Sequence, residues 1–380
     1  MAKYIKEFKV KLFAEITAVP EFLQGSYYRS LDGLRGLSIL IVIFAHFGIN
    51  RFLKPYSLFI DSSIGVHIFF VLSGFLITTL LIKEKIKNGR ISLKQFYIRR
   101  ILRIIPVSYL FLSTLIILNF CYQLKIEPLD FIASFLFLKN LPIGNSVFTA
   151  HLWSLAVEEQ FYLTFPFLLA FSINRFVTAA LFLIVLIPVI LILGFYLPEV
   201  LFNNLTVRVF TKILMYSFWK GPLIILIGSL FSILAFKGII NVDKINSNYF
   251  LGFVLLLIAI LIHTKTFFFY SKYYSEYLSA CIIGYVIILS INEKNSLLSV
   301  ILNSVSLVKA RILSYSLYIW QELFIGGLPW QPWLKSWNGY PLQLIIVLKL
   351  IYIFLIASIS YYFFESKFLR FKKRFKGVKL

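Results

Sequence analysis

Long apolar runs recur along the whole 380-residue chain, separated by short polar stretches that carry most of its Lys and Arg. A helix needs about 20 apolar residues to cross roughly 30 Å of bilayer hydrocarbon. Runs of this length, or nearly so, predict an all-α, polytopic integral membrane protein with about ten transmembrane helices. The runs cover residues 34–49, 62–82, 104–121, 155–172, 176–197, 213–235, 249–264, 277–291, 311–328 and 341–363. A shorter apolar segment, 129–141, is expected to lie at the interface or to re-enter the membrane.

The composition supports a membrane protein with little soluble mass. The chain is 60% hydrophobic and 14% charged, whereas soluble domains are about 45–50% apolar and about 25% charged. The net charge of +22 could suggest nucleic acid as a partner. Because the basic residues lie between apolar runs, membrane orientation and contact with anionic lipid explain them better, and no nucleic acid is expected. The two cysteines have no metal-binding spacing, and no metal is expected.

The distribution of Lys and Arg predicts how the chain is oriented. Ten spans place both termini on one side, and the loops on that side hold most of the basic residues. The positive-inside rule therefore predicts that both termini are cytoplasmic. Residues 1–27 read as a basic amphipathic cytoplasmic arm, 28–366 as the membrane domain and 367–380 as a basic cytoplasmic tail.

The first apolar run carries a cation and an imidazole on one face. Arg35 and His46 are eleven positions apart, which is three helical turns and ~16 Å along the axis. Ionisable groups in hydrocarbon are costly, so a functional site facing the bundle interior is the default interpretation. The alternative is an Arg that reaches the interface and a His that is hydrogen-bonded in the core.

A second cluster of cations precedes the third predicted span. Arg99, Arg100 and Arg103 lie just before Pro106, and Arg100 and Arg103 share a helical face. Guanidinium groups donate two parallel hydrogen bonds to phosphate oxygens. The cluster is therefore either a site for a phosphorylated cytoplasmic ligand or an anchor to lipid headgroups.

Two further stretches hold polar residues inside apolar runs. In GVHIFFVLSGFLIT, the small residues around Ser73 permit close helix packing, and His67 either faces a site or caps its helix. In HLWSLAVEEQFY, which begins at His151, Glu158 and the next glutamate point about 100° apart and cannot both face one cavity. A carboxylate there could orient a histidine or belong to a structural hydrogen-bond network.

Taken together in this order, these motifs resemble the acyltransferase 3 family of integral membrane proteins that O-acylate cell-envelope sugars. Arg35 and His46 match its Arg, ten residues, His motif, and Arg100 and Arg103 match its Arg-x-x-Arg motif. FFVLSGFLIT, HLWSLAVEEQFY, SYSLYIW and YYFFESKFL resemble its other signatures, over about residues 28–370. Gln321 stands where many members have a His, and His67 where an acidic residue is frequent.

The resemblance implies transfer of an acyl group, foremost acetyl, from cytoplasmic acyl-CoA to a hydroxyl of a cell-surface or lipid-linked polysaccharide. Its partners would be acyl-CoA, a sugar acceptor and membrane lipid, and its location the bacterial cytoplasmic membrane. His46 would act as general base or acyl carrier, with Glu158 orienting it, and Arg35 would belong to the same catalytic site and could also contact the donor phosphates. The phosphates would bind Arg99, Arg100 and Arg103. Supporting roles are implied for His67, Ser73, His151 and Gln160.

Two other functions remain open at this point. Intramembrane His and Glu side chains could instead relay protons in a transporter or flippase, although the chain shows no inverted repeat. Gln321 cannot act as a base, so the chain could also be a catalytically silent relative.

Overall fold

The described part of the computed structural model is helical, and it contains no β-strand. It comprises residues 2–56, 59–197, 199, 203–218, 221–240, 249–264, 274–292, 296–325, 341–372 and 374–375. Six helical segments within it are long and apolar enough to cross a membrane. They are α2 (Arg29–Phe47), α4 (Ser62–Asn88), α5 (Leu93–Tyr122), the first 22 residues of α9 (Ile173–Tyr196), α14 (Ser275–Asn292) and Gln343–Lys372. The predicted all-α multi-pass membrane protein is confirmed.

The other helices lie between and around these segments. They are α1 (Ala2–Phe13), η1 (Glu21–Leu23), α3 (Asn50–Leu53), η2 (Lys54–Tyr56), α6 (Pro128–Phe135), α7 (Val147–Ala150), α8 (Leu152–Phe171), α11 (Leu205–Phe218), α12 (Pro222–Phe236), α13 (Leu251–His263), α15 (Leu297–Leu302), α16 (Val305–Trp320) and η4 (Gln321–Phe324). Gln343–Lys372 consists of α18 (Leu342–Ile359), the π-helical turn η5 (Ser360–Glu365) and α19 (Ser366–Lys372).

One predicted span is not a single helix. The run 213–235 is divided, because α11 ends at Phe218 and α12 begins at Pro222. Proline has no backbone N–H to donate and disfavours a helical conformation in the residue before it, so it starts a helix more readily than it continues one. Hydropathy alone cannot detect such a break.

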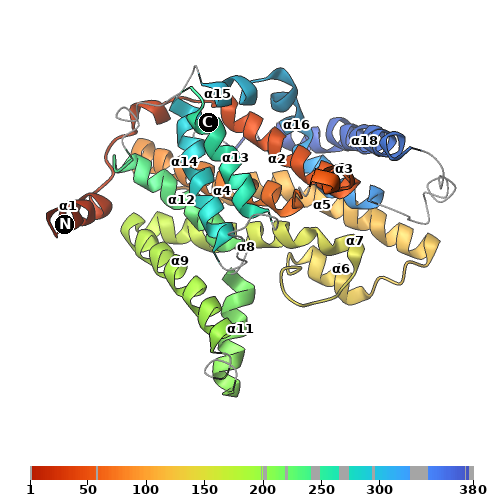
Figure 1. Ribbon diagram of the computed structural model, residues 1–380, viewed down its shortest axis with the longest axis horizontal. Coiled ribbons are helices and arrows are strands. Elements are labelled where there is room, and N and C mark those ends of the chain that lie inside the picture. The colour runs from red at the N-terminus through yellow and green to blue at the C-terminus, as the bar shows by residue number, and fades with distance from the viewer. Residues whose placement is uncertain are drawn as a thin grey trace.

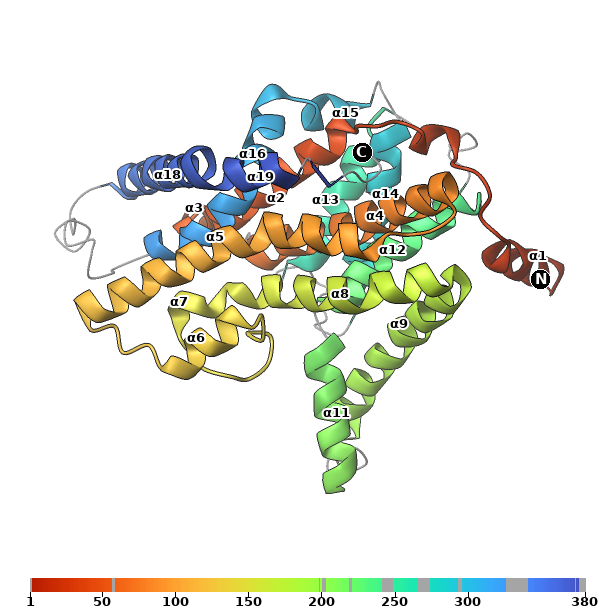
Figure 2. The ribbon, with the colours of Figure 1, turned by 180° about the vertical axis from the view of Figure 1, so that it is seen from behind.

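The helices form a body from which one limb projects. Figures 1 and 2 show α2, α4, α5 and α8 running side by side, whereas α9 and α11 extend away from them. Within the body, α4 packs against α12 and α2, and α2 packs against α16.

Glycines allow two of these helix pairs to approach closely. A Cβ on Gly74 of α4 would lie 1.9 Å from the carbonyl oxygen of Ile225 in α12, so no larger side chain fits there. On α2, a Cβ on Gly36 would lie 2.0 Å from the carbonyl oxygen of Leu307 in α16. The small residues thus have the packing role that the sequence predicted, and they bring α2 against α16 along its length.

The short apolar segment before α8 folds back alongside α5. Tyr109 is 13 residues, or ~20 Å along the helix axis, before the end of α5 at Tyr122. Its hydroxyl donates a hydrogen bond to the carbonyl of Phe135 (3.1 Å). Gln160, in the middle of α8, exchanges hydrogen bonds with Asn140 (3.0 and 2.8 Å). This segment therefore lies beside the middle of α5 and α8. Whether it lies at the membrane interface or re-enters the membrane stays a prediction.

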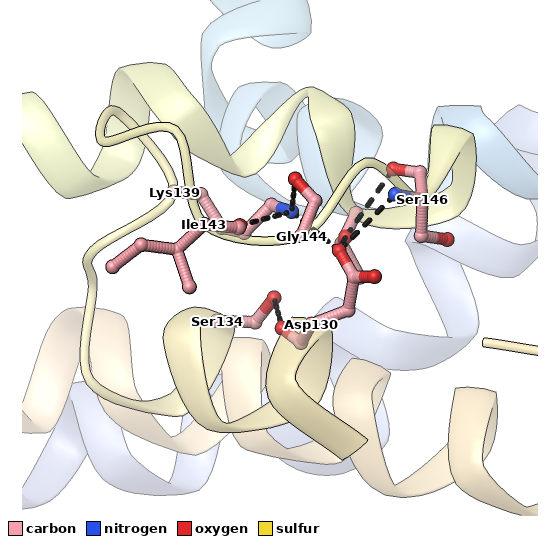
Figure 3. Close-up of polar contacts among 7 residues, drawn as sticks. Asp130, Ser134, Lys139, Ile143, Gly144 and Ser146 are labelled. Atoms are coloured by element: carbon pink, nitrogen blue, oxygen red, sulfur yellow. Dashed lines mark hydrogen bonds and ion pairs between the residues drawn. The ribbon is translucent and has the colours of Figure 1, made fainter. Parts of the chain in front are cut away.

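A buried ion pair holds the segment before α8 together (Figure 3). Lys139 Nζ lies 2.6 Å from Asp130 Oδ1, and the two side chains are 4% and 3% exposed. Lys139 also donates to the carbonyls of Ile143 and Gly144, and the Ser146 N–H donates to Asp130. These bonds satisfy backbone groups of the loop that no regular helix pairs.

Lys139→Met is expected to destabilise the protein by about 3–5 kcal/mol, because it leaves a buried carboxylate without its cation. Adding Asp130→Leu should recover a large part of that loss, since an apolar pair has no charge to desolvate. Thermal unfolding of the purified protein in detergent measures both. A double variant no more stable than Lys139→Met would contradict the ion-pair account.

Candidate functional site

A cavity lies between five helices of the body and encloses about 700 Å³ of empty space, part of it open to solvent. Helices α2, α4, α5, α8 and α16 each contribute side chains to its wall. The lining residues are Arg35, Val66, Phe69, Phe70, Ser73, Arg100, Arg103, Ile104, Ser154, Leu155, Glu158, Ser314, Tyr315 and Tyr318. Each of the four motifs that the sequence analysis singled out thus supplies part of one site.

Three guanidinium groups gather at one end of this cavity. Arg35 comes from the second turn of α2, and Arg100 and Arg103 come from the first half of α5. The Arg100 guanidinium also stacks over the ring of Tyr162, 4.3 Å from its centroid. The three cations are close enough to interact electrostatically, and because like charges repel, this end of the cavity favours an anionic ligand.

Arg99 lies apart from these three cations. It does not line the cavity. Its Nη2 lies 3.8 Å from Glu84 Oε2, near the C-terminal end of α4, which is expected to face the cytoplasm. The structure therefore does not support its predicted place beside Arg100 and Arg103. Neighbouring helical positions point about 100° apart, so α5 cannot direct both Arg99 and Arg100 into the same cavity.

Two cations near this end were missed by the sequence analysis. Arg311 of α16 pairs with Asp32 of α2, Nε to Oδ1 at 2.8 Å. Lys372, the last residue of α19, is close enough to interact electrostatically with Arg35 and Arg103. In the sequence both lie in basic loops. The pattern of charges therefore does not separate them from the Lys and Arg residues that only set the orientation of the chain in the membrane.

The carboxylate of Glu158 faces the cavity, and that of Glu159 is not among the lining groups. The hydroxyls of Ser73 (2.5 Å) and Tyr162 both donate to Glu158 Oε1. The prediction that only one of the two adjacent glutamates faces the site is confirmed. Glu158 makes no bond to His46, however, so its predicted orienting role is not supported.

His46 is held instead by the residue that departs from the family pattern. Its Nδ1 lies 3.3 Å from Oε1 of Gln321, the first residue of η4. Gln321 is fully buried. The stripe Ser314, Tyr318 and Gln321 follows a 3.6-residue period, and its first two members line the cavity. Gln321 and His46 therefore lie one turn beyond the cavity wall, at the end remote from the arginines.

His151 lies next to this pair. Its Nδ1 is 3.6 Å from Oε2 of Glu322, the residue after Gln321, and both side chains are largely buried. The Tyr318 hydroxyl donates to the His151 carbonyl oxygen (2.6 Å) and contacts the Ser154 hydroxyl. The structure therefore contains a carboxylate–histidine pair, but it joins Glu322 to His151 and not, as the sequence analysis expected, Glu158 to His46.

Two other predicted supporting residues lie outside the cavity wall. His67 packs edge-on against His263, with ring centroids 4.6 Å apart. Gln160 holds the segment before α8 in place, because it bonds to Asn140 and donates to the carbonyl of Phe137 (2.9 Å). Neither residue lines the cavity, and no signal in the sequence separates them from the residues that do.

The arrangement suits a long ligand with an anionic end. Phosphate groups would bind the guanidinium cluster, and the opposite end of the ligand would reach the imidazoles. Arg35 and His46, on one face of α2, are ~16 Å apart along the helix. No cluster of three metal-ligating side chains occurs within the described ranges.

Comparison with known proteins agrees with this chemistry. A family model described as an acyltransferase domain matches residues 28–368. The O-acetyltransferase OatA of Staphylococcus aureus is 28% identical over 385 residues, which cover 94% of this chain and 58% of that protein. The peptidoglycan O-acetyltransferase OatA of Listeria monocytogenes is 40% identical over 160 residues, 38% of this chain and 25% of that protein. The chain thus spans less than two thirds of the length of either relative. No solved structure matches it.

Proposed function

Because this chain belongs to the acyltransferase 3 family, we propose that it is a membrane O-acyltransferase that moves an acetyl group from acetyl-CoA to a hydroxyl of a cell-envelope glycan. The observation that carries the proposal is the cavity, which has three arginines at one end and a held imidazole beyond the other. The relative named as a peptidoglycan O-acetyltransferase favours peptidoglycan, or a precursor of it, as the acceptor.

The donor would bind with its phosphates against Arg35, Arg100 and Arg103. Charge-assisted bonds from guanidinium groups to phosphate are strong and directional. Arg311 and Lys372 extend the same positive field toward the mouth of the cavity. Glu158, bonded to Ser73 and Tyr162, would keep this cluster from carrying an uncompensated charge.

The acyl end of the donor would then lie toward Tyr318 and His46. As a base, His46 would take the proton of the acceptor hydroxyl while that oxygen attacks the thioester carbon. The C–S bond then breaks, and the thiolate takes the proton from the imidazolium. An imidazole starts near the pKa that suits such proton transfers at neutral pH.

The proposed orientation places the donor and the acceptor on opposite faces of the bacterial cytoplasmic membrane. With the N-terminus in the cytoplasm, α2 would bring the arginine end of the cavity to the cytoplasmic face and its His46 end to the other. This agrees with the excess of Lys and Arg in the loops of the first face.

The test uses purified protein in liposomes, with radiolabelled acetyl-CoA supplied on the side of the arginine cluster and peptidoglycan fragments on the other. Label is expected in an alkali-labile ester on the glycan. If acetyl-CoA is bound but no ester forms, the transferase proposal fails. The results would then favour a transporter or flippase, or a catalytically silent relative.

A further inference from the structure

The side chain of Gln321 has one satisfied end and one unsatisfied end. Its Oε1 contacts His46 Nδ1 at 3.3 Å, whereas its Nε2 is buried and has no hydrogen-bond partner among the described residues. A buried amide N–H without a partner costs about 1–3 kcal/mol. Native proteins contain few buried polar groups without a hydrogen-bond partner, and those that occur are often at functional sites.

The position of Gln321 makes the reacting acyl group a suitable partner. Gln321 follows Tyr318 by three residues, on the stripe of α16 and η4 whose earlier members line the cavity. It also contacts the imidazole that the proposed reaction uses as a base. A carbonyl oxygen placed for attack by a hydroxyl bound to His46 would therefore lie in the neighbourhood of this amide.

We propose that Gln321 is a catalytic residue with two functions, which rest on the transferase function proposed above. Its Oε1 accepts a hydrogen bond from His46 Nδ1–H, and its Nε2–H donates to the oxygen of the thioester carbonyl. An amide oxygen can only accept, so this contact fixes the tautomer in which His46 Nε2 is free to act as a base.

The reaction then proceeds with every proton accounted for. The acceptor hydroxyl gives its proton to His46 Nε2 as its oxygen bonds to the acyl carbon. The electron pair of the C=O moves to the oxygen, where the Gln321 N–H stabilises the negative charge. The carbonyl re-forms, the C–S bond breaks, and the thiolate takes the proton from His46. The products are an ester and a free thiol.

Three substitutions at this position separate the proposal from a packing role. Gln321→Met keeps the length of the side chain but removes both donor and acceptor. Gln321→Glu keeps an acceptor but removes the donor. Gln321→His restores both, because one ring nitrogen accepts and the other donates. Phe324→Leu, in the same turn, is the control.

The kcat and KM for acetyl-CoA are measured for each purified protein, together with thermal unfolding. Loss of one oxyanion donor costs about 10²–10³ in kcat, so Gln321→Met and Gln321→Glu should both fall by at least this factor with KM within threefold. Gln321→His and Phe324→Leu should stay within about tenfold of the wild type. The Met variant should be no less stable, because it buries fewer polar atoms.

Wild-type turnover in Gln321→Met would overturn the proposal, and so would a Gln321→Glu variant that keeps its kcat. If the kcat of Gln321→His is no higher than that of Gln321→Met, then the proposal that residue 321 acts through one hydrogen-bond donor and one hydrogen-bond acceptor is also wrong. Absence of transfer by the wild type is a different result, because it rejects the proposed function itself.

Discussion

Replacing His46 by Ala is expected to abolish acyl transfer without lowering the amount of protein in the membrane. General bases contribute roughly 10²–10⁴ in rate, and His46 is the imidazole that the Gln321 amide contacts. Its ring is partly exposed, so its loss leaves no sealed void in the core. Radiolabel transferred from acetyl-CoA to the glycan, normalised to protein by immunoblot, measures the effect.

The control for this variant is Phe44→Ala on the same helix. Phe44 is 37% exposed and does not line the cavity, so its removal should leave turnover within about twofold of the wild type. Turnover near the wild-type level in His46→Ala would remove this imidazole from the mechanism. Equal losses in both variants would point to damage of α2.

Arg103→Ala is expected to weaken use of the donor while kcat changes less. Hydrogen bonds to charged groups are worth about 1.5–3 kcal/mol, which corresponds to roughly a 10- to 150-fold higher KM for acetyl-CoA. Arg100→Ala should act in the same direction, because both guanidinium groups line the same end of the cavity. Initial rates over a range of acetyl-CoA concentrations give the comparison.

Arg99→Ala is the matched control for this prediction. It removes the same charge four residues earlier on α5, but Arg99 faces Glu84 and not the cavity. Its KM should stay within about threefold of the wild type. If Arg99→Ala and Arg103→Ala raise the KM equally, the whole cluster acts as a surface field or lipid anchor, and the specific phosphate site is rejected.

The polar residues of the site could be found in the sequence because hydrocarbon makes them conspicuous. Arg35, Ser73 and Glu158 interrupt apolar runs and Arg103 directly precedes one, and all four line the cavity. Their partners could not be found in the same way. The bond between His46 and Gln321 joins residues 275 positions apart, and a helical period describes only the neighbours on one helix.

Basic residues that look alike in the sequence have different surroundings in the structure. Arg99, Arg100 and Arg103 look alike in the sequence, yet the rotation of α5 sends one to Glu84 and two into the cavity. Arg311 and Lys372 look like orienting residues of loops, yet they lie near the same cluster. Only the packing of separate helices determines which cations share a site.

The sequence by itself determined that the chain is an all-helical membrane protein, and it showed which ionisable residues lie in or beside its apolar runs. Hydrophobic length and the cost of burying charge are local properties, so they can be read from any stretch of the chain. The tertiary structure alone decided that Gln321 holds His46, that Glu322 pairs with His151, and that 213–235 is broken at Pro222. These outcomes depend on how glycine-mediated contacts set one helix against another, which no single stretch of the chain contains.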